Sequence, residues 1–87
     1  MVVGDAVNTI AVGTLNIQPT SGIEWIIHNI FHNTDTTLSI VSSANTITFD
    51  TDIGAGIWAK YPFHATNTFY LQAISSGTIA ADGIVSK

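Results

Sequence analysis

The chain has 87 residues, a net charge of −4 at pH 7 and no cysteine, which excludes disulfides, thiolate nucleophiles and thiolate metal sites. Charged residues make up only 9% of it, and the two cations, Lys60 and Lys87, are too few for a surface that follows nucleic-acid phosphates. No apolar run reaches the roughly 18 residues of a membrane span, and no basic leader precedes an apolar core. We therefore expect one soluble domain over residues 1–87, without a secretion signal, a membrane or a nucleic-acid partner.

A domain of this size is only marginally stable by itself. It buries about 60% of the surface that its unfolded chain exposes, and no disulfide supplements that core. Thr, Ser and Asn supply most of the polarity instead of charged residues. Because such a surface is buried at little desolvation cost compared with Lys and Glu, we expect oligomerisation to stabilise the protein.

The chain begins with a predicted N-terminal arm, residues 1–5. Two extended segments follow, 6–12 and 14–18, in which apolar residues recur at alternate positions. They meet at Gly13, which we expect to be a bulge or a bend rather than a hairpin turn.

The strand that we expect to organise the domain is 23–32, which follows a turn over 19–22. Both of its predicted faces are largely apolar: Ile23, Trp25, Ile27 and Phe31 lie on one, and Glu24, Ile26, His28, Ile30 and His32 on the other. A strand with one face in water would alternate apolar and polar residues. The pattern therefore predicts a central strand, covered on both sides.

A hairpin comes next along the chain. The segments 36–41 and 46–51 alternate and are joined by turn residues at 42–45. In the second segment, the alternation predicts Ile47 and Phe49 on the inward face.

The remaining residues predict three more strands. Pro62 cannot donate to a ladder, which places the segment 57–64 at a sheet edge or a bulge. The last two segments, 69–74 and 78–86, alternate on either side of a turn at 75–77. Seven or eight short strands separated by turns predict an all-β domain, a compact antiparallel β-sandwich with jelly-roll-like connections.

Three histidines are the first candidates for a site. His28 and His32 lie four residues apart on one strand, roughly 13 Å, too far to share a metal ion. His64 could complete a metal site on a symmetry axis if the sheet placed it beside one of them. Packing or interface roles are favoured for all three, so we predict no metal and no cofactor and retain these histidines as interface candidates.

The acidic residues do not predict catalysis. Asp35, Asp50 and Asp52 lie near glycines, but the ligand spacing of a calcium loop is missing, which favours solvated turn residues. Asp52 also replaces the glycine that would complete an aspartic-protease triplet. The G-x-S-x-G motif of a serine hydrolase is absent. Glu24 is the only glutamate, and no aspartate is spaced from it in a way that favours the carboxylate pair of a glycosidase. We expect a protein that is not an enzyme.

Trp58 is the aromatic residue whose role is most open. Its predicted side of the strand is opposite to that of Tyr61 and Phe63. It could belong to the core, anchor a subunit interface, or form a sugar-stacking platform with Tyr70. Trp58 and Tyr70 therefore join the histidines as interface candidates.

Several segments together resemble a group of small structural proteins of tailed bacteriophages. They are 19–27 (PTSGIEWII), the polar-tipped hairpin, 54–58, 65–68 (ATNT) and 82–85 (DGIV). The resemblance implies a virion component that binds and does not catalyse: a capsid decoration (cement) protein, or a head-fibre or spike subunit. It further implies a homo-oligomer, with a trimer favoured, that is made in the host cytoplasm and placed on the capsid surface against the major capsid protein. A carbohydrate-binding or host-attachment module, and a monomeric domain of a host protein, are the alternatives.

Overall fold

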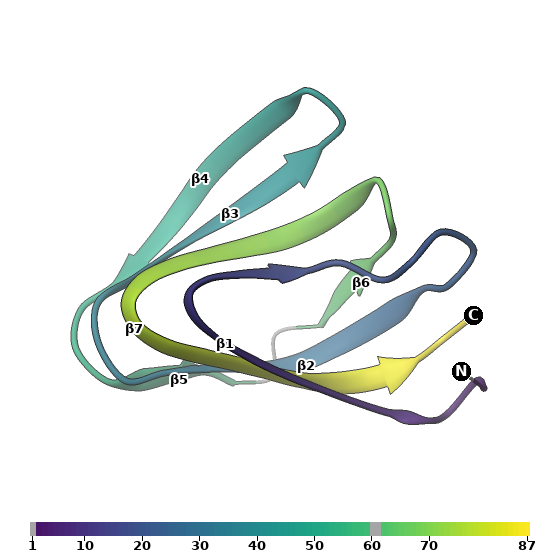
Figure 1. Ribbon diagram of the computed structural model, residues 1–87, viewed down its shortest axis with the longest axis horizontal. Coiled ribbons are helices and arrows are strands. Elements are labelled where there is room, and N and C mark those ends of the chain that lie inside the picture. The colour runs from purple at the N-terminus through teal and green to yellow at the C-terminus, as the bar shows by residue number, and fades with distance from the viewer. Residues whose placement is uncertain (1, 60–61) are drawn as a thin grey trace.

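Seven antiparallel strands make up the fold in the computed structural model, which describes residues 2–59 and 62–87 (Figure 1). They are β1 (Ala6–Ile17), β2 (Trp25–His32), β3 (Thr36–Ser42), β4 (Asn45–Asp52), β5 (Gly56–Trp58), β6 (Phe63–Ala65) and β7 (Phe69–Val85). Hydrogen bonds join all seven into one sheet in the order β4-β3-β7-β2-β5, with β1 on β7 and β6 on β2. The all-β antiparallel prediction is confirmed. A sandwich of two separate sheets is not seen in this topology.

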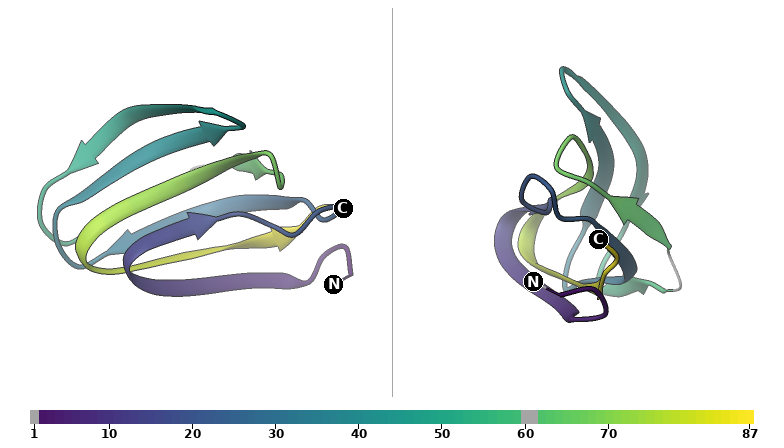
Figure 2. Two further views of the ribbon diagram at one scale, coloured as in Figure 1. Left: turned by 45° about the horizontal axis from the view of Figure 1, so that its top comes forward. Right: turned by 90° about the vertical axis from the view of Figure 1, so that its right-hand side faces the viewer.

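The sheet curls into a half-barrel because its longest strands bend without breaking (Figure 2). β7 pairs with β3 through its first half and with β2 through its second half, while β1 follows its other edge along both halves. The register of β1 shifts at Gly13, which has a φ of 87° and confirms the predicted bulge. The predicted turn at 75–77 is instead a bend inside β7. A Cβ on Gly77 would collide with the side chains of Asn33 and Thr34, so a larger residue at this bend would require them to shift.

The core lies on the concave side of the bent sheet. It contains alternate residues from five strands, and several are fully buried: Ile17, Ile27, Ile30, Leu38, Leu71, Ala73 and Ile79. The two halves of β7 contribute to one cluster because the bend turns both toward the same interior. A single folded sheet thus encloses a core that two sheets would enclose in a sandwich.

β2 is central, as predicted, but its two faces are assigned wrongly from the sequence. The register with β7 shifts between Ile27 and Asn29, which makes His28 an extra, bulged residue. The bulge reverses the alternation, so Ile30 is buried and Phe31 is 40% exposed on the convex face. The prediction that Phe31 shares the buried face of Ile27 is therefore wrong.

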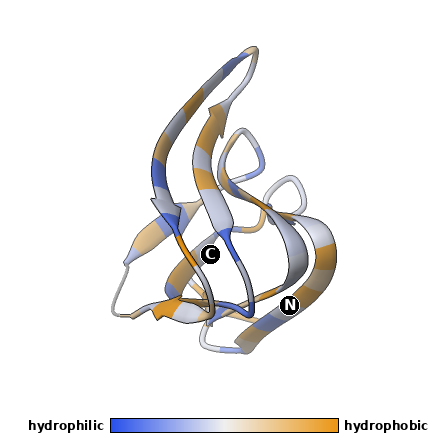
Figure 3. Ribbon diagram, turned by 90° about the vertical axis from the view of Figure 1, so that its left-hand side faces the viewer, coloured by the Kyte–Doolittle hydropathy of each residue, from blue (hydrophilic) through white to orange (hydrophobic). Residues whose placement is uncertain are grey.

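The predicted hairpin is confirmed as β3 and β4, and it projects from the body of the half-barrel (Figure 1). The predicted inward face of its second strand is wrong for this chain, because Ile47 is 63% exposed and Phe49 38%. Residues 45–51 are exposed on both faces. Hydrophobic and hydrophilic residues both occur along this hairpin (Figure 3).

The predicted strand 57–64 is two short strands, β5 and β6, and each pairs only with β2 among the described residues. This agrees with the edge position that Pro62 predicted, whereas the predictions for Lys60 and Tyr61 lie outside the described residues. In the N-terminal arm, Gly4 donates its amide to Val85 O at 2.8 Å. The described part of the chain has no helix long and apolar enough to cross a membrane.

Candidate functional site

His32 is a buried anchor at the end of β2. Its Nδ1 lies 2.9 Å from the carbonyl oxygen of Thr34 and its Nε2 lies 2.8 Å from Oδ2 of Asp52. Because a carbonyl and a carboxylate both accept, the ring fills both contacts only when both nitrogens carry protons or when Asp52 itself is protonated. The contact joins the last residue of β4 to the last residue of β2, two strands that are not paired.

Trp58 lies against this anchor. Its ring centroid is 4.8 Å from that of His32, and its Nε1 donates to Oδ2 of Asp50 at 2.7 Å. We name His32, Asp50, Asp52 and Trp58 the clasp. It connects β2 and β5 to β4 across the open side of the half-barrel, and its tryptophan is half-buried against the core.

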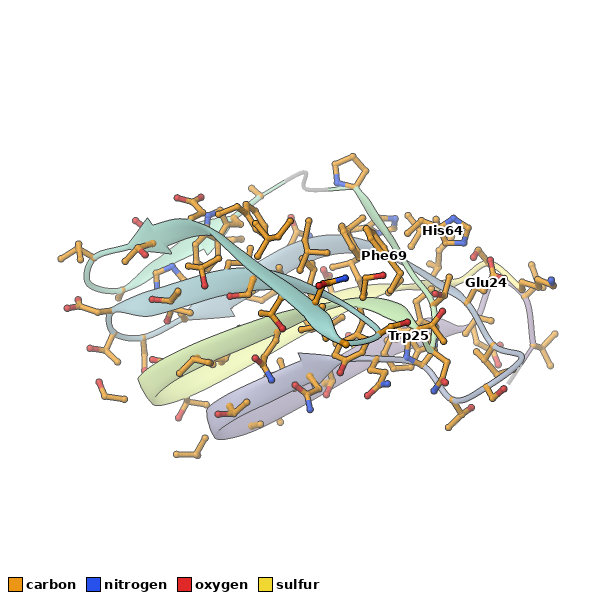
Figure 4. The ribbon with its side chains drawn as sticks, turned by 90° about the horizontal axis from the view of Figure 1, so that it is seen from above. Glu24, Trp25, His64 and Phe69 are labelled. Atoms are coloured by element: carbon orange, nitrogen blue, oxygen red, sulfur yellow. The ribbon has the colours of Figure 1, made fainter. Side chains whose placement is uncertain are left out.

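The other predicted interface candidates lie elsewhere. His64 is exposed on β6, and its Nε2 lies 2.6 Å from Oε1 of Glu24 at one end of the molecule (Figure 4). His28 is exposed at the β2 bulge, while Tyr70 is half-buried on β7 with Val41 as its cross-strand partner. The structure therefore brings together only His32 and Trp58 of the five candidates, and the platform of Trp58 with Tyr70 is not formed.

The acidic residues have structural contacts. Asp50 and Asp52 belong to the clasp, and Oδ1 of Asp35 accepts the amide of Gly54 at 2.6 Å. All three carboxylates therefore have protein partners, where the sequence predicted solvated turn residues. Among residues 2–59 and 62–87, no three His, Asp or Glu side chains come close enough to hold a metal ion.

The first exposed surface of note is the β4 edge, which we define as residues 45–52. β4 pairs with β3 alone in the described structure, so the backbone groups of its other edge have no strand partner there. On this strand Ile47 is 63% exposed and Phe49 is 38% exposed. Unpaired backbone together with exposed apolar side chains is a ready site for another strand.

The second surface is on the convex face, where two rows of side chains cross β1, β7 and β2. The apolar row consists of cross-strand partners Ile10, Ala80 and Phe31, and it continues to Ile57 on β5. The polar row, two residues further along each strand, consists of Asn8, Asp82 and Asn29. Between and above these rows lies a hollow of ≈ 390 Å³, the convex-face hollow, lined by Asn8, Ile10, Phe31, Ala80 and Asp82.

The sequence did not predict this hollow, because it depends on the bulge that turns Phe31 outward. The one available signal is the polar pair His28 and Asn29, which interrupts an otherwise apolar run. A polar pair of this kind is compatible with a bulge but does not require one.

Comparisons with known proteins give no further guide to the site. No family model matches the chain, and no curated protein matches it.

Proposed function

We propose that the chain is a virion structural protein, a capsid decoration protein that binds the major capsid protein and reinforces the shell of a tailed bacteriophage. It is made in the host cytoplasm and acts as a homo-oligomer on the capsid surface, with a trimer favoured by the resemblance of 19–27 and 82–85 to such proteins. The number and spacing of the predicted strands favour jelly-roll-like connections for the sheet. The role is binding and not catalysis, since the acids and His32 serve structural contacts.

The observation that carries this proposal is the uncovered β4 edge. A free edge with Ile47 and Phe49 exposed is a liability for a lone protein, and natural proteins usually shorten, charge or cover such edges. Here residues 45–49 carry no charge. A second copy that covers β4 would remove both the unpaired backbone and the exposed apolar surface.

β1 offers the complementary edge for that second copy. It has 12 residues and pairs only with β7, so its outer edge is also free in the described structure. Pairing of β4 in one copy with β1 in the next is a head-to-tail contact, which closes into a ring when the rotation between copies permits it. Such a ring would then repeat over the shell, where many modest contacts add through multivalency.

Light scattering over a concentration series tests the assembly. We expect the wild-type protein to form a closed oligomer and Ile47→Lys to be a monomer, because a buried ammonium group would have no partner at the covered edge. The matched control is Thr46→Lys, which adds the same charge on the other face of the same strand. A wild-type monomer at every concentration, or equal loss of assembly in both variants, would contradict the proposed edge contact.

Co-sedimentation with empty shells of the coat protein tests the decoration role. Saturable binding at a fixed ratio to the shell subunits is the expected result. Absence of the protein from the shell pellet at concentrations where it is oligomeric would contradict decoration.

A further inference from the structure

The structure points to a second role: we infer that the convex-face hollow binds a neutral saccharide. This goes beyond the proposed assembly, because the hollow lies on the convex face of the sheet, whereas the proposed contact uses the outer edges of β4 and β1. β1 takes part in both, through its edge in the assembly and through Asn8 and Ile10 in the hollow. The hollow has a volume of ≈ 390 Å³ and is a shallow depression, open to solvent rather than enclosed. A flat sugar ring could lie against it, with its other face in water.

The floor and walls of the hollow are apolar. Ala80 is the small central residue, and its cross-strand partners Ile10 and Phe31 rise on either side. Ile10 is 71% exposed, so its side chain is available to a ligand. The C–H face of a pyranose ring packs well on such a surface, because the π face of an aromatic ring attracts the positively polarised hydrogens.

The polar row supplies hydrogen bonds at one side of this floor. It lies about 6.6 Å from the apolar row, the distance between residues i and i+2 of a strand. Asn29 Nδ2 donates to Oδ1 of Asp82 at 3.0 Å, which holds the carboxylate in place. Among the described residues, Oδ2 of Asp82 has no hydrogen-bond partner.

A carboxylate oxygen accepts hydrogen bonds and cannot donate them, so Oδ2 of the partly exposed Asp82 can accept a hydrogen bond from a ligand in place of water. Sugar hydroxyls are such donors, and O–H···O⁻ bonds are stronger than those between neutral groups. The exposed amide of Asn8, directly across from Asp82, can both donate and accept. An apolar floor beside a fixed acceptor and an amide matches a ring with one C–H face and hydroxyl groups at its rim.

Other occupants match the hollow less well. A second copy stacked face to face about a twofold axis would bring two Asp82 carboxylates together, with no described Lys or Arg lining the hollow. A peptide strand would pair with a free sheet edge: β7 is paired on both sides here, and the proposed assembly already uses the outer edge of β1. A single carboxylate is too few ligands for a calcium ion.

The test is a titration of the ¹⁵N-labelled full chain with maltose, lactose, N,N′-diacetylchitobiose and mannobiose. The chemical shifts of the backbone amides are measured at each saccharide concentration. We expect at least one of the saccharides to cause saturable shifts at Asn8, Ile10, Phe31, Ala80 and Asp82. Asp82→Asn keeps an oxygen that can accept from Asn29 but loses the negative charge, and we expect it to weaken binding about tenfold or more. Phe31→Leu keeps apolar volume without an aromatic face and should do the same.

Ile74→Ala is the matched control, since Ile74 is exposed and apolar on the other half of β7. It should leave saccharide affinity unchanged. Each variant is first checked for a cooperative thermal transition, and Ile10→Ser replaces Phe31→Leu if the latter does not fold.

Several outcomes would overturn the inference. They are the absence of saturable shifts, shifts confined to residues outside the hollow, and unchanged saccharide affinity in Asp82→Asn. Binding of a lysine-containing peptide when no saccharide binds would also overturn it, because Asp82 would then serve a cationic ligand. Concentration-dependent shifts at Phe31, Ala80 and Asp82 in the Ile47→Lys variant without saccharide would overturn it too, because a second copy would then cover the hollow independently of the β4–β1 contact. The Ile47→Lys monomer separates the two proposals: saccharide binding there supports the hollow whatever happens to assembly.

Discussion

β7 and β4 show how similar alternation can have opposite outcomes in one sheet. β7 is paired along both edges. In each of its halves alternate residues are buried on one face, among them Leu71, Ala73 and Ile79. β4 is paired along one edge, and its residues 45–51 are all exposed. Alternation therefore marks the side of a strand that is suited to burial, while the neighbouring strands, or another molecule, supply the cover.

This difference has an energetic consequence. Full burial of a Leu or Ile side chain stabilises a protein by about 1.5–3 kcal/mol, which β7 gains during folding of the single chain. Ile47 on β4 gains little of it in this fold. That part of the hydrophobic free energy remains available to association.

The largest expected effect comes from replacing one large apolar side chain on each of the two strands by alanine. Leu71→Ala should lower the free energy of unfolding by about 2–5 kcal/mol, because it leaves a cavity in the core. Ile47→Ala should change it by less than about 0.5 kcal/mol in dilute solution, where β4 is uncovered. Urea denaturation measures both, and similar losses would contradict the contrast between the strands.

A smaller effect is expected from Gly83 in the second half of β7, which faces the β2 bulge. A Cβ there would collide with the backbone oxygen of Ile26 and lie 2.9 Å from Cα of Ile27. Gly83→Ala should therefore cost about 1–3 kcal/mol of stability. Ser76→Ala, an exposed position on the same strand, is the control, and equal stability of the two variants would show that the bulge adapts freely.

The clasp should have the smallest effect on stability, because it ties β4 to the body through few contacts. His32→Gln should cost about 1–2 kcal/mol by disturbing the buried contacts with Thr34 and Asp52. Trp58→Phe removes the bond to Asp50 together with part of the ring that packs on His32, and we expect a loss of about 0.5–1.5 kcal/mol. Guanidinium denaturation of both variants gives the order, and a larger loss in Trp58→Phe would mean that its packing dominates the clasp.

Local signals in the sequence were sufficient for part of the fold. The hairpin, the irregularity at Gly13 and the edge position around Pro62 each depend on a few adjacent residues, and the structure confirms them. The continuity of β7 and the bulge at His28 depend on partners more than 40 residues away, such as Asn33 opposite Gly77 and Gly83 opposite Ile27. One sequence does not reveal such pairings, because strand register is set by the neighbouring strand.

The sites were less predictable for the same reason. His32 and Trp58 were identified as residues of interest, but their joint role in the clasp requires that β4 be positioned across the half-barrel. The convex-face hollow requires Ile10, Ala80 and Phe31 to be aligned on three strands. A bulge of one residue determines that alignment.

Amide hydrogen exchange of β4 tests most directly the claim that another copy covers this strand. The measurement compares dilute protein with the concentration at which light scattering shows the oligomer, and it uses Ile47→Lys as the uncovered reference. The account predicts that those amides in residues 45–51 that do not bond to β3 gain protection on association in the wild type and stay unprotected in the variant. Rapid exchange of these amides in the wild-type oligomer would contradict it.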